Sequence, residues 1–225
     1  MEFDCKWHLT RPSSGLRKLS RILYQTARQL ATRAVGGVNF KSHTKGIHMQ
    51  ASHIATISKY DKHRAEAREI AEASLPAHLK GVLNISGISH RELAAFKCWQ
   101  VMPERKVDWN WLFSARYCTV YPKAFDMSVW RGNTLCSLSL GRPTYKGTEM
   151  RLDFIERLPK NCQYAGEMFT ISLLAYEIYG ELIGAKKLRI MEPLNDKLIK
   201  YYTSHGGFEF VDSKKGNPHY LVRNL

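Results

Sequence analysis

One stretch of the chain combines residue types whose spacing could bind an anion. Residues 158–185 read LPKNCQYAGEMFTISLLAYEIYGELIGA, which predicts a strand end, a short polar loop with Gln163 and Gly166, and then a helix. The backbone N–H groups of such a loop and of the first helical turn lack partners within the helix. Together with the helix dipole they favour binding of an anion, and of phosphate above all. The loop therefore predicts a phosphate-binding site.

The helix after this loop has an apolar face. Its members are Ile171, Leu174, Ala175, Ile178 and Leu182, which recur at helical spacing. We expect them to share one side of the helix and to face the protein core. Gly184 is expected to end the helix in a left-handed conformation.

The cysteines and histidines show no pattern of comparable chemical meaning. The five cysteines are Cys5, Cys98, Cys118, Cys136 and Cys162. Their spacing is irregular and includes no C-x-x-C pair, so neither a disulfide framework nor a zinc site is indicated, and a reducing, cytoplasmic location is expected. Cys162 lies in the loop, but no histidine is near it in the sequence, and we expect no catalytic role for it. His43, His48 and His53 do not share a helical face, so we expect loop or strand histidines and no metal site.

The elements that would position the loop follow from the hydrophobic period. Helices are expected at residues 62–75 and 89–101, the second starting with a capping box of Ser89 and Glu92. After residue 114 the period becomes that of strands. The expected strands are at residues 115–121, 125–130, 134–140, 150–158, 187–191, 208–211 and 219–222. Asn195 is expected to cap a short helix at 196–202. The strand–helix–strand unit at 150–191 requires a parallel pair, which predicts a mixed α/β sheet with helices on its faces.

The bulk composition predicts a globular protein with an unusually basic start. The chain has 225 residues, 44% of them hydrophobic, and a net charge of +14. Residues 1–65 hold 12 Lys and Arg against 3 Asp and Glu, a balance of +9. A basic amphipathic helix expected at 14–34 could bind RNA, lie on a membrane surface or pack on the body of the protein. Such a segment attracts nucleic acid, anionic lipid or an acidic partner, or it simply aids solubility. No apolar run is long enough for a membrane span.

From about residue 85 to residue 225 the sequence resembles the GNAT acyltransferase superfamily. The phosphate loop of that family reads [QR]-x-x-G-x-[GA] between the fourth strand and the next helix. Gln163-Tyr-Ala-Gly166-Glu-Met168 stands in that place, with Met168 where the family usually has Gly or Ala. Residues 184–211 also resemble a block of the family in which Asn195 and Tyr202 match its Asn and Tyr.

The resemblance implies a GNAT-like mixed sheet flanked by helices. Residues 61–225 would form the acyltransferase domain and residues 1–60 a basic, mainly helical N-terminal extension. Acetyl-CoA or another acyl-CoA would be the co-substrate, and an amine on a protein, an aminoacyl-tRNA or a small molecule would accept the acyl group. Coenzyme A would contact Leu158, Gln163, Tyr164, Ala165, Gly166, Glu167, Met168 and Asn195. A side chain as large as Met168 is expected to crowd the pyrophosphate.

The resemblance also suggests where the proton transfers occur. The amine must be neutral to attack, so a base must lie beside it. Glu156, at the end of the fourth strand, is the first candidate, and Asp153 is expected to point to the opposite face. Tyr202, with Tyr201 as second candidate, would protonate the leaving thiolate. The alternative is a non-catalytic GNAT-like module that binds nucleic acid or an anionic surface through residues 1–60.

Overall fold

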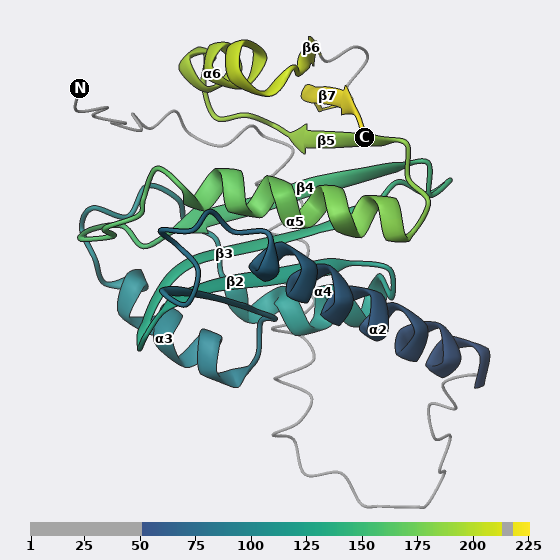
Figure 1. Ribbon diagram of the computed structural model, residues 1–225, viewed down its shortest axis with the longest axis horizontal. Helices are drawn as coiled ribbons and strands as arrows, with labels where there is room; N and C mark the ends of the chain where they lie inside the picture. Colours follow the sequence, from purple (N-terminus) through teal and green to yellow (C-terminus); the bar gives the residue numbers. More distant parts are fainter. Residues whose placement is uncertain (1–50, 213–217) are drawn as a thin grey trace, which may run out of the picture. The chain divides into compact units, whose positions relative to one another are not determined.

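A computed structural model describes residues 51–212 and 218–225, which belong to one compact unit, Ala51–Leu225. Its centre is a seven-stranded sheet in the order β1-β2-β3-β4-β5-β7-β6 (Figure 1). The strands are β1 (Leu83–Ser86), β2 (Phe125–Arg131), β3 (Thr134–Pro143), β4 (Glu149–Arg157), β5 (Lys187–Met191), β6 (Glu209–Val211) and β7 (Tyr220–Asn224). The helical elements are α2 (Ala51–Ala73), α3 (His90–Gln100), η1 (Trp111–Phe113), α4 (Ser114–Val120), α5 (Met168–Leu182) and α6 (Asp196–Gly206). The expected helix at 14–34, His43 and His48 lie outside these residues.

The sheet is mixed, as the strand–helix–strand unit predicts. Strands β1 to β4 are antiparallel neighbours, β4 and β5 are parallel, and β5, β7 and β6 are again antiparallel. The β4–β5 pairing extends only from Glu149 opposite Lys187 to Leu152 opposite Ile190. Strand β4 continues to Arg157. The two central strands therefore separate after Leu152, and the outer half of β4 is unpaired on that side.

A β-bulge lies where β4 leaves β5. Leu140 of β3 pairs with Phe154 and the next residue, Gly141, pairs with Leu152, so Asp153 is the extra residue. A Cβ on Gly141 would lie 1.9 Å from the carbonyl oxygen of Arg151, a distance that only glycine avoids. An extra residue changes which side chains share a face of the strand.

The bulge overturns one expectation from the sequence. Asp153 and Glu156 were expected on opposite faces, but both contact the segment that includes η1 and α4. Asp153 accepts a hydrogen bond from Tyr117 of α4, and Glu156 accepts one from Trp111 of η1. A simple alternation would separate two residues three positions apart, and the inserted residue cancels that separation.

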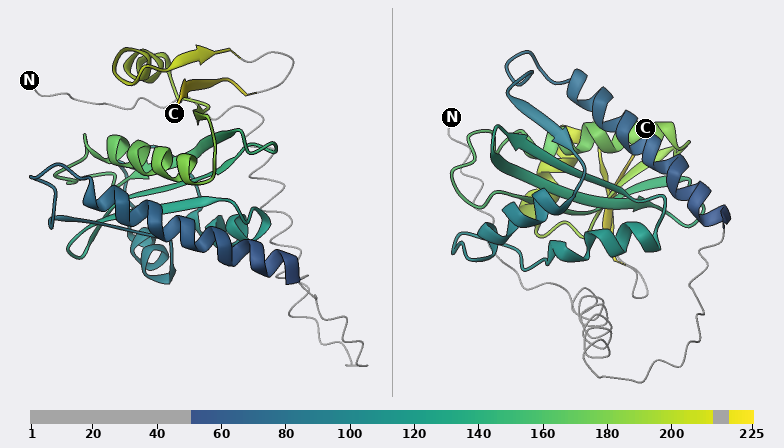
Figure 2. Two further views of the ribbon diagram at one scale, coloured as in Figure 1. Left: turned by 45° about the vertical axis from the view of Figure 1, so that its right-hand side comes forward. Right: turned by 90° about the horizontal axis from the view of Figure 1, so that it is seen from below.

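Helices cover both faces of the sheet (Figure 2). On one face α2 and α5 pack over Met127 and Leu152. On the other face α3, η1 and α4 pack over Leu138 and Leu140. Each face buries a continuous apolar cluster, which is the main driving force for this architecture. Within the described residues, no helix is both long and apolar enough to cross a membrane.

Helix α5 buries a wider face than its apolar spacing predicts. Ile171 and Ala175 are buried as expected. Leu174, Ile178 and Leu182 are only partly buried, whereas Tyr176 and Tyr179 are fully enclosed. The hydroxyls of these two tyrosines donate to backbone carbonyls of Phe125 and Lys123 at 3.1 and 3.0 Å. The buried face of α5 is rotated because the helix packs between the sheet and α2. The two tyrosines can be buried because their hydroxyls donate hydrogen bonds to backbone carbonyls.

Three element assignments from the sequence are corrected. Helix α2 begins at Ala51 rather than near residue 62, contains His53 and continues through the expected domain boundary at 60 and 61. Residues 114–120 form helix α4 rather than a strand, after the Asn110 side chain accepts a hydrogen bond from Leu112 N–H and starts the helical turn of η1. Strand β1 was not expected, since four residues are too few to show a period.

Several local expectations are confirmed. Ser89 and Glu92 form the capping box of α3. Asn195 caps α6 by accepting a hydrogen bond from Leu198 N–H. Gly184, two residues after the last residue of α5, has the expected left-handed backbone, with φ of +79°. The antiparallel pairs β2–β3 and β6–β7 form as their alternation predicts.

Candidate functional site

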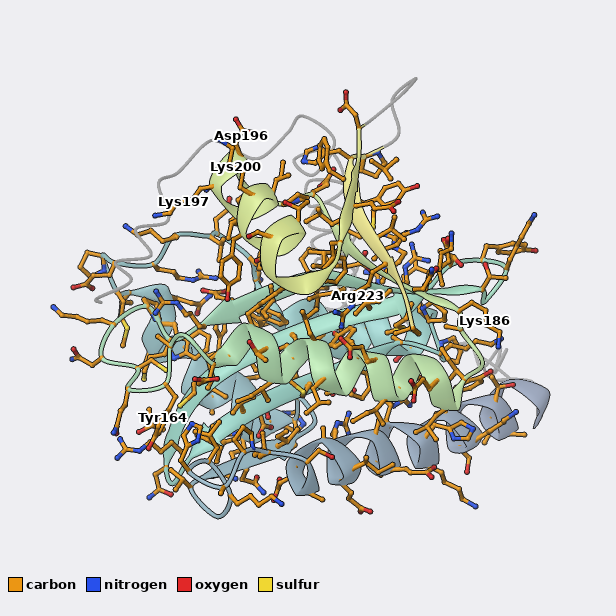
Figure 3. The ribbon with its side chains drawn as sticks, turned by 45° about the horizontal axis from the view of Figure 1, so that its top comes forward. Tyr164, Lys186, Asp196, Lys197, Lys200 and Arg223 are labelled. Atoms are coloured by element: carbon orange, nitrogen blue, oxygen red, sulfur yellow. The ribbon has the colours of Figure 1, made fainter. Side chains whose placement is uncertain are left out.

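Three segments meet around the point where β4 and β5 separate. The β4–α5 loop (residues 158–167) leads from the unpaired end of β4 into α5. Residues 192–195 lead from β5 into α6. The segment 101–120, which contains η1 and α4, covers the face of the sheet that carries Asp153 and Glu156. Figure 3 shows Tyr164 on the loop and Lys197 and Lys200 on α6 at the same side of the view.

The β4–α5 loop presents backbone donors without acceptors. Ala165 N–H donates to Cys162 O at 3.1 Å and Glu167 N–H to Tyr164 O at 2.9 Å. Within the described part of the chain, no backbone acceptor lies in hydrogen-bond range of the N–H groups of Gly166, Met168, Phe169 and Thr170. The helix start also has no side-chain cap. Uncapped N–H groups at the positive end of a helix dipole are what an anion site requires.

The space in front of these donors is open. Gln163 and Gly166 are exposed, and a Cβ added to Gly166 would meet no atom within 4 Å. Gly166 also has an ordinary negative φ. The backbone conformation therefore does not require glycine at position 166. The absence of a side chain instead leaves open the space where a bound anion would lie.

Met168 does not crowd this space. Its side chain is 1% exposed and belongs to the apolar core beneath α5. The expectation that this side chain faces the anion is therefore wrong, because the first residue of α5 points down onto the sheet. Only its N–H group faces the open end of the helix.

The remaining residues expected to contact coenzyme A differ in what they can offer. Leu158 is buried, and its N–H already donates to Cys136 O at 2.8 Å. Ala165 and Glu167 are half-buried loop residues. Tyr164 is half-buried beside Arg131, whose guanidinium carbon lies 5.8 Å from the centre of its ring. The Asn195 side-chain oxygen is occupied by the cap of α6, which leaves its amide N–H₂ for a ligand.

The two candidate tyrosines occupy different environments on α6. Tyr202 is 4% exposed, and its ring stacks on Phe169 in the first turn of α5 at 4.3 Å between ring centres. Tyr201 is 43% exposed and meets Tyr202 edge to face. Tyr202 is therefore the one that lies against the start of α5, beside the unpaired N–H groups.

Glu156 is held by partners that the sequence did not reveal. Its carboxylate accepts hydrogen bonds from Arg105 Nε at 2.6 Å, Arg105 Nη2 at 3.1 Å and Trp111 Nε1 at 2.7 Å. Burial raises the pKa of Glu156 above its usual value, and the hydrogen bonds from Arg105 and Trp111 oppose that rise. Residues 101–113 have no regular period, so no sequence signal pointed to these partners.

A second set of charged groups lines the opening itself. The bulge residue Asp153 accepts from Tyr117 Oη at 2.6 Å and pairs with Arg151 Nη2 at 2.5 Å. Glu192, two residues beyond the last β4–β5 pair, has a left-handed backbone with φ of +46°. Burial raises the pKa of Glu192, and the nearby His219 opposes that rise. No ion pair or side-chain hydrogen bond engages the Glu192 carboxylate among residues 51–212 and 218–225. The only sequence signal for Glu192 was its place at the end of β5.

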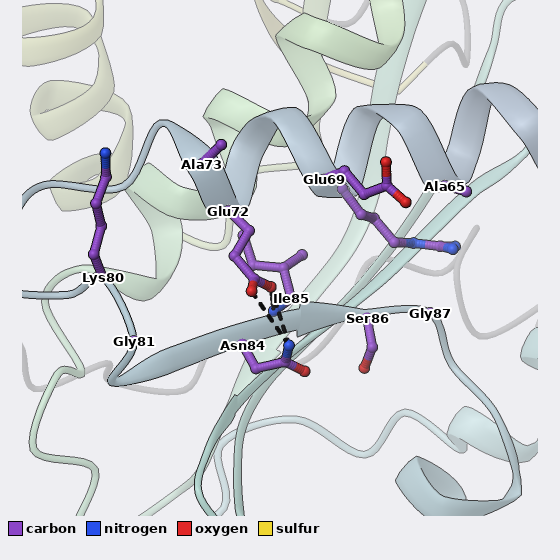
Figure 4. Close-up of a pocket in the computed structure, with 11 residues that line it drawn as sticks. Ala65, Glu69, Glu72, Ala73, Lys80, Gly81, Asn84, Ile85, Ser86 and Gly87 are labelled. Carbon is purple, nitrogen blue, oxygen red and sulfur yellow. Dashed lines mark hydrogen bonds between the residues drawn. The ribbon is translucent and has the colours of Figure 1, made fainter.

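A hollow of about 630 Å³ lies elsewhere, between α2 and β1 (Figure 4). Its wall is fixed by Glu72, which accepts hydrogen bonds from Ile85 N–H at 2.6 Å and Asn84 Nδ2 at 3.1 Å. Glu72 thereby satisfies the outer N–H of the edge strand. This hollow lies at the sheet edge that β1 forms, away from the β4–β5 opening, and we assign no chemistry to it.

Comparison with known proteins identifies the fold. No family model and no curated protein sequence matches the chain. An acetyltransferase from Thermus thermophilus superposes with a TM-score of 0.50 over 64% of this chain and 97% of its own, at 12% identity. Ard1 from Thermoplasma volcanium (TM-score 0.47, 16% identity, 64% and 98% covered) is also similar. So is Arabidopsis thaliana Naa50 with the bisubstrate analogue CoA-Ac-MVNAL (TM-score 0.44, 12% identity, 64% and 99% covered).

The likeness to the Thermus thermophilus acetyltransferase shows the fold. The chain has the fold of the GNAT acetyltransferases: a mixed sheet that opens between its fourth and fifth strands, with helices on both faces. The resemblance that the sequence implied is confirmed at this level.

Proposed function

We propose that the protein is an acyl-CoA-dependent N-acyltransferase, in which acetyl-CoA or another acyl-CoA delivers its acyl group to an amine. The observation that carries this proposal is the set of unpaired N–H groups at Gly166, Met168, Phe169 and Thr170, beside the separated strands β4 and β5. The N–H groups suit the pyrophosphate of coenzyme A, and the unpaired edge of β4 suits the amides of its pantetheine arm. Acyl-CoA is also the co-substrate that the resemblance to the GNAT superfamily implies.

We assign the loop residues to two roles in this proposal. Gly166, Met168 and the first turn of α5 supply backbone donors, while Gln163 and Tyr164 border the anion. Asn195 offers its amide N–H₂ from the start of α6. Lys197 and Lys200, exposed on α6, add positive charge (Figure 3), which offsets the negative charge of Glu167 next to the loop.

The proposed proton acceptor for the amine is Glu156, acting through water because Arg105 and Trp111 already hold its carboxylate. Glu192 is the alternative acceptor, since its carboxylate lacks such partners in the described residues. A raised pKa makes either carboxylate a stronger base. Tyr202 is the proposed donor to the leaving thiolate, with Tyr201 as second candidate.

The pH dependence of kcat/KM separates the two carboxylates. The acid that must be deprotonated produces a loss of rate at low pH. Glu192→Gln is expected to remove that acidic limb if Glu192 is the base, while Glu156→Gln leaves the limb in place and lowers stability. If only Glu156→Gln removes the acidic limb, Glu156 is the base.

The proposal is tested by binding and by transfer. Purified protein is expected to bind acetyl-CoA in calorimetry, and labelled acetyl-CoA is expected to pass its acetyl group to an amine in a cell lysate. Gly166→Asp should abolish both, because a carboxylate would fill the anion space. Thr148→Asp, in the exposed β3–β4 connection at the other end of β4, adds the same charge and should change neither. Failure of the wild-type protein to bind acetyl-CoA would refute the proposal.

The acceptor class is a finer proposal that rests on charge. The balance of +9 over residues 1–65 favours an anionic acceptor such as an aminoacyl-tRNA over a neutral small amine. The same charge supports the alternative of a non-catalytic module that binds nucleic acid or an anionic surface. A salt-dependent RNA gel shift that disappears on deletion of residues 1–50 supports an RNA contact. The deletion must end at residue 50 because α2 packs on α5.

A further inference from the structure

Three arginines stand in register across the middle of the sheet. Arg142 of β3 pairs with Arg151 of β4, and Arg151 pairs with Arg189 of β5. Paired residues of neighbouring strands share one face of a sheet. Leu152 and Ile190, the next residues along, belong to the core cluster on the α5 face. The three arginines, here called the arginine row, therefore lie on the opposite face, which η1 and α4 cover in part.

The fold alone gives no reason for the arginine row. Like charges directly opposite each other destabilise a sheet, and neighbouring strands are only about 4.8 Å apart. Two carboxylates offset part of this repulsion. Asp153 accepts a hydrogen bond from Arg151 Nε at 3.0 Å and lies 3.9 Å from Arg142 Nε, and Glu149 forms an ion pair with Arg189. The third guanidinium leaves the cluster with an excess positive charge.

The carboxylates of this cluster are more deeply buried than the guanidiniums that they hold. The side chains of Asp153 and Glu149 are 7% and 16% exposed, whereas the three arginine side chains are 24–27% exposed. The negative charges therefore position the arginines from inside, and the positive charges face the solvent. An outward guanidinium cluster of this kind attracts anions.

The arginine row has unused hydrogen-bond donors in fixed positions. Within the described residues Arg142 donates no hydrogen bond, and its guanidinium carbon lies 4.0 Å from the centre of the Tyr121 ring. The guanidinium carbon of Arg189 lies 4.2 Å from the centre of the Tyr220 ring, and its Nε is buried without a hydrogen-bond partner in the same part of the chain. The two rings hold the guanidinium planes. Donors from separate strands suit a tetrahedral phosphate, which has several acceptor oxygens, better than a planar carboxylate, which a single guanidinium satisfies.

The arginine row lies just before β4 and β5 separate. Arg151 and Arg189 form the pair directly before the last one, Leu152 opposite Ile190. Glu192 follows Arg189 by three positions, which corresponds to about 10 Å along a strand. A phosphate on the row would therefore lie near the opening without filling it.

We propose that the arginine row binds a phosphate group of the amine acceptor. The acceptor then carries its amine on the order of 10 Å from a phosphate. A nucleic acid with an attached amine and a small phosphorylated amine share this chemistry. The net charge of +14 favours partners rich in phosphate. That the bound molecule is the acceptor rests on the proposed function, whereas the phosphate site itself does not.

Binding of two phosphate probes to the full-length protein tests the arginine row. The probes are a fluorescein-labelled single-stranded RNA, measured by fluorescence polarisation at fixed salt, and adenosine monophosphate, measured by calorimetry. Arg142→Gln should weaken binding about tenfold, or about 1.4 kcal/mol, because a charge-assisted hydrogen bond to the phosphate is lost. Weakening confined to the RNA assigns a nucleic-acid acceptor. Weakening that includes the monophosphate assigns a small phosphorylated acceptor.

Variants provide the matched controls. Arg189→Gln combined with Glu149→Gln removes a guanidinium without leaving its carboxylate unpaired, and should weaken binding as Arg142→Gln does. Lys62→Gln, at an exposed position of α2 on the other face of the sheet, removes the same charge and should leave both affinities unchanged. Equal binding of the wild-type protein and both variants of the arginine row would overturn the proposal. A loss of affinity for an acidic peptide alone would overturn the choice of phosphate.

Acetyl-CoA binding separates this inference from the proposed function. The arginine row lies on the face opposite α5, so its variants should bind acetyl-CoA as the wild-type protein does. Gly166→Asp fills the anion space at the loop and should leave probe binding to the row in place. If the row binds phosphate and the protein does not bind acetyl-CoA, the acyltransferase proposal fails and the phosphate site stands. If acetyl-CoA binds and the row variants keep full affinity for both probes, the inference fails and the acyltransferase proposal stands.

Discussion

Replacement of Arg105 by methionine isolates the buried ion pair that holds Glu156. The two side chains are 11% and 4% exposed, and Arg105 provides two of the three hydrogen bonds to the carboxylate. Arg105→Met therefore leaves a buried carboxylate with Trp111 as its remaining donor. Breaking a buried pair in this way costs about 3–5 kcal/mol. For a unit of this size that corresponds to a fall in melting temperature of roughly 6–20 °C.

The sign of the pH dependence follows from the raised pKa of Glu156. A carboxyl whose pKa is higher in the folded protein than its ordinary value of 4.5 stabilises the fold when protonated. That contribution is fully present below the ordinary value and is lost as the pH rises through the folded value. Loss of Arg105 raises the pKa of Glu156 further, so Arg105→Met should destabilise the protein more at pH 8 than at pH 5.

Urea denaturation at both pH values measures the effect. Arg105→Met combined with Glu156→Gln removes the unpaired charge and should be more stable at pH 8 than Arg105→Met alone, with a coupling free energy of about 1–3 kcal/mol. The surface pair of Lys160 and Glu104 is the control, and Lys160→Met should leave stability unchanged. Equal stability of the Arg105→Met single variant and the double variant at pH 8 would refute the reasoning.

Three further predictions concern the proposed phosphate loop and the proposed proton donor. Met168→Leu should change acetyl-CoA affinity by less than about twofold, because the side chain is in the core and the swap conserves volume; a larger loss in calorimetry would place that side chain at the ligand. Met168→Ala should instead cost about 2–5 kcal/mol of stability by urea denaturation, and an unchanged midpoint would contradict its burial. Tyr202→Phe should lower kcat by about a hundredfold with little change in KM, whereas Tyr201→Phe should have a small effect; the reverse ranking in a transfer assay would assign the donor role to Tyr201.

The sequence predicts those parts of the fold whose signals are local. The capping box at Ser89, the cap at Asn195 and the alternation in β2 and β3 each depend on a few neighbouring residues, and each is confirmed. The β4–α5 loop was found for the same reason, since a polar loop before an amphipathic helix is readable in one stretch. Residues 115–121 were expected to form a strand but lie mostly in α4, because this helix follows the turn η1, which the cap at Asn110 starts.

The parts of the candidate site that could not be predicted from the sequence depend on contacts between distant segments. Arg105 and Glu156 are separated by 51 positions in the sequence, and Tyr117 and Asp153 by 36. No spacing rule joins such pairs. The side-chain direction of Met168 likewise depends on how α5 rests on the sheet, which its own residue type does not determine. The bulge at Asp153 was not predicted for a related reason, because it depends on the pairing of β4 with its neighbour β3.

Because Gly141 has no Cβ, it permits the bulge that determines which side chains of β4 lie on each face of the sheet. A methyl group in place of its hydrogen would collide with the carbonyl of Arg151, so the strands could accept it only by re-pairing. Without the bulge, the side chains of β4 beyond Asp153 would exchange faces. Glu156 would then point towards α5, and Ile155 would meet Arg105 and Trp111. A substitution on the neighbouring strand would thus replace a carboxylate by a hydrocarbon beside Arg105 and Trp111 without altering any residue there.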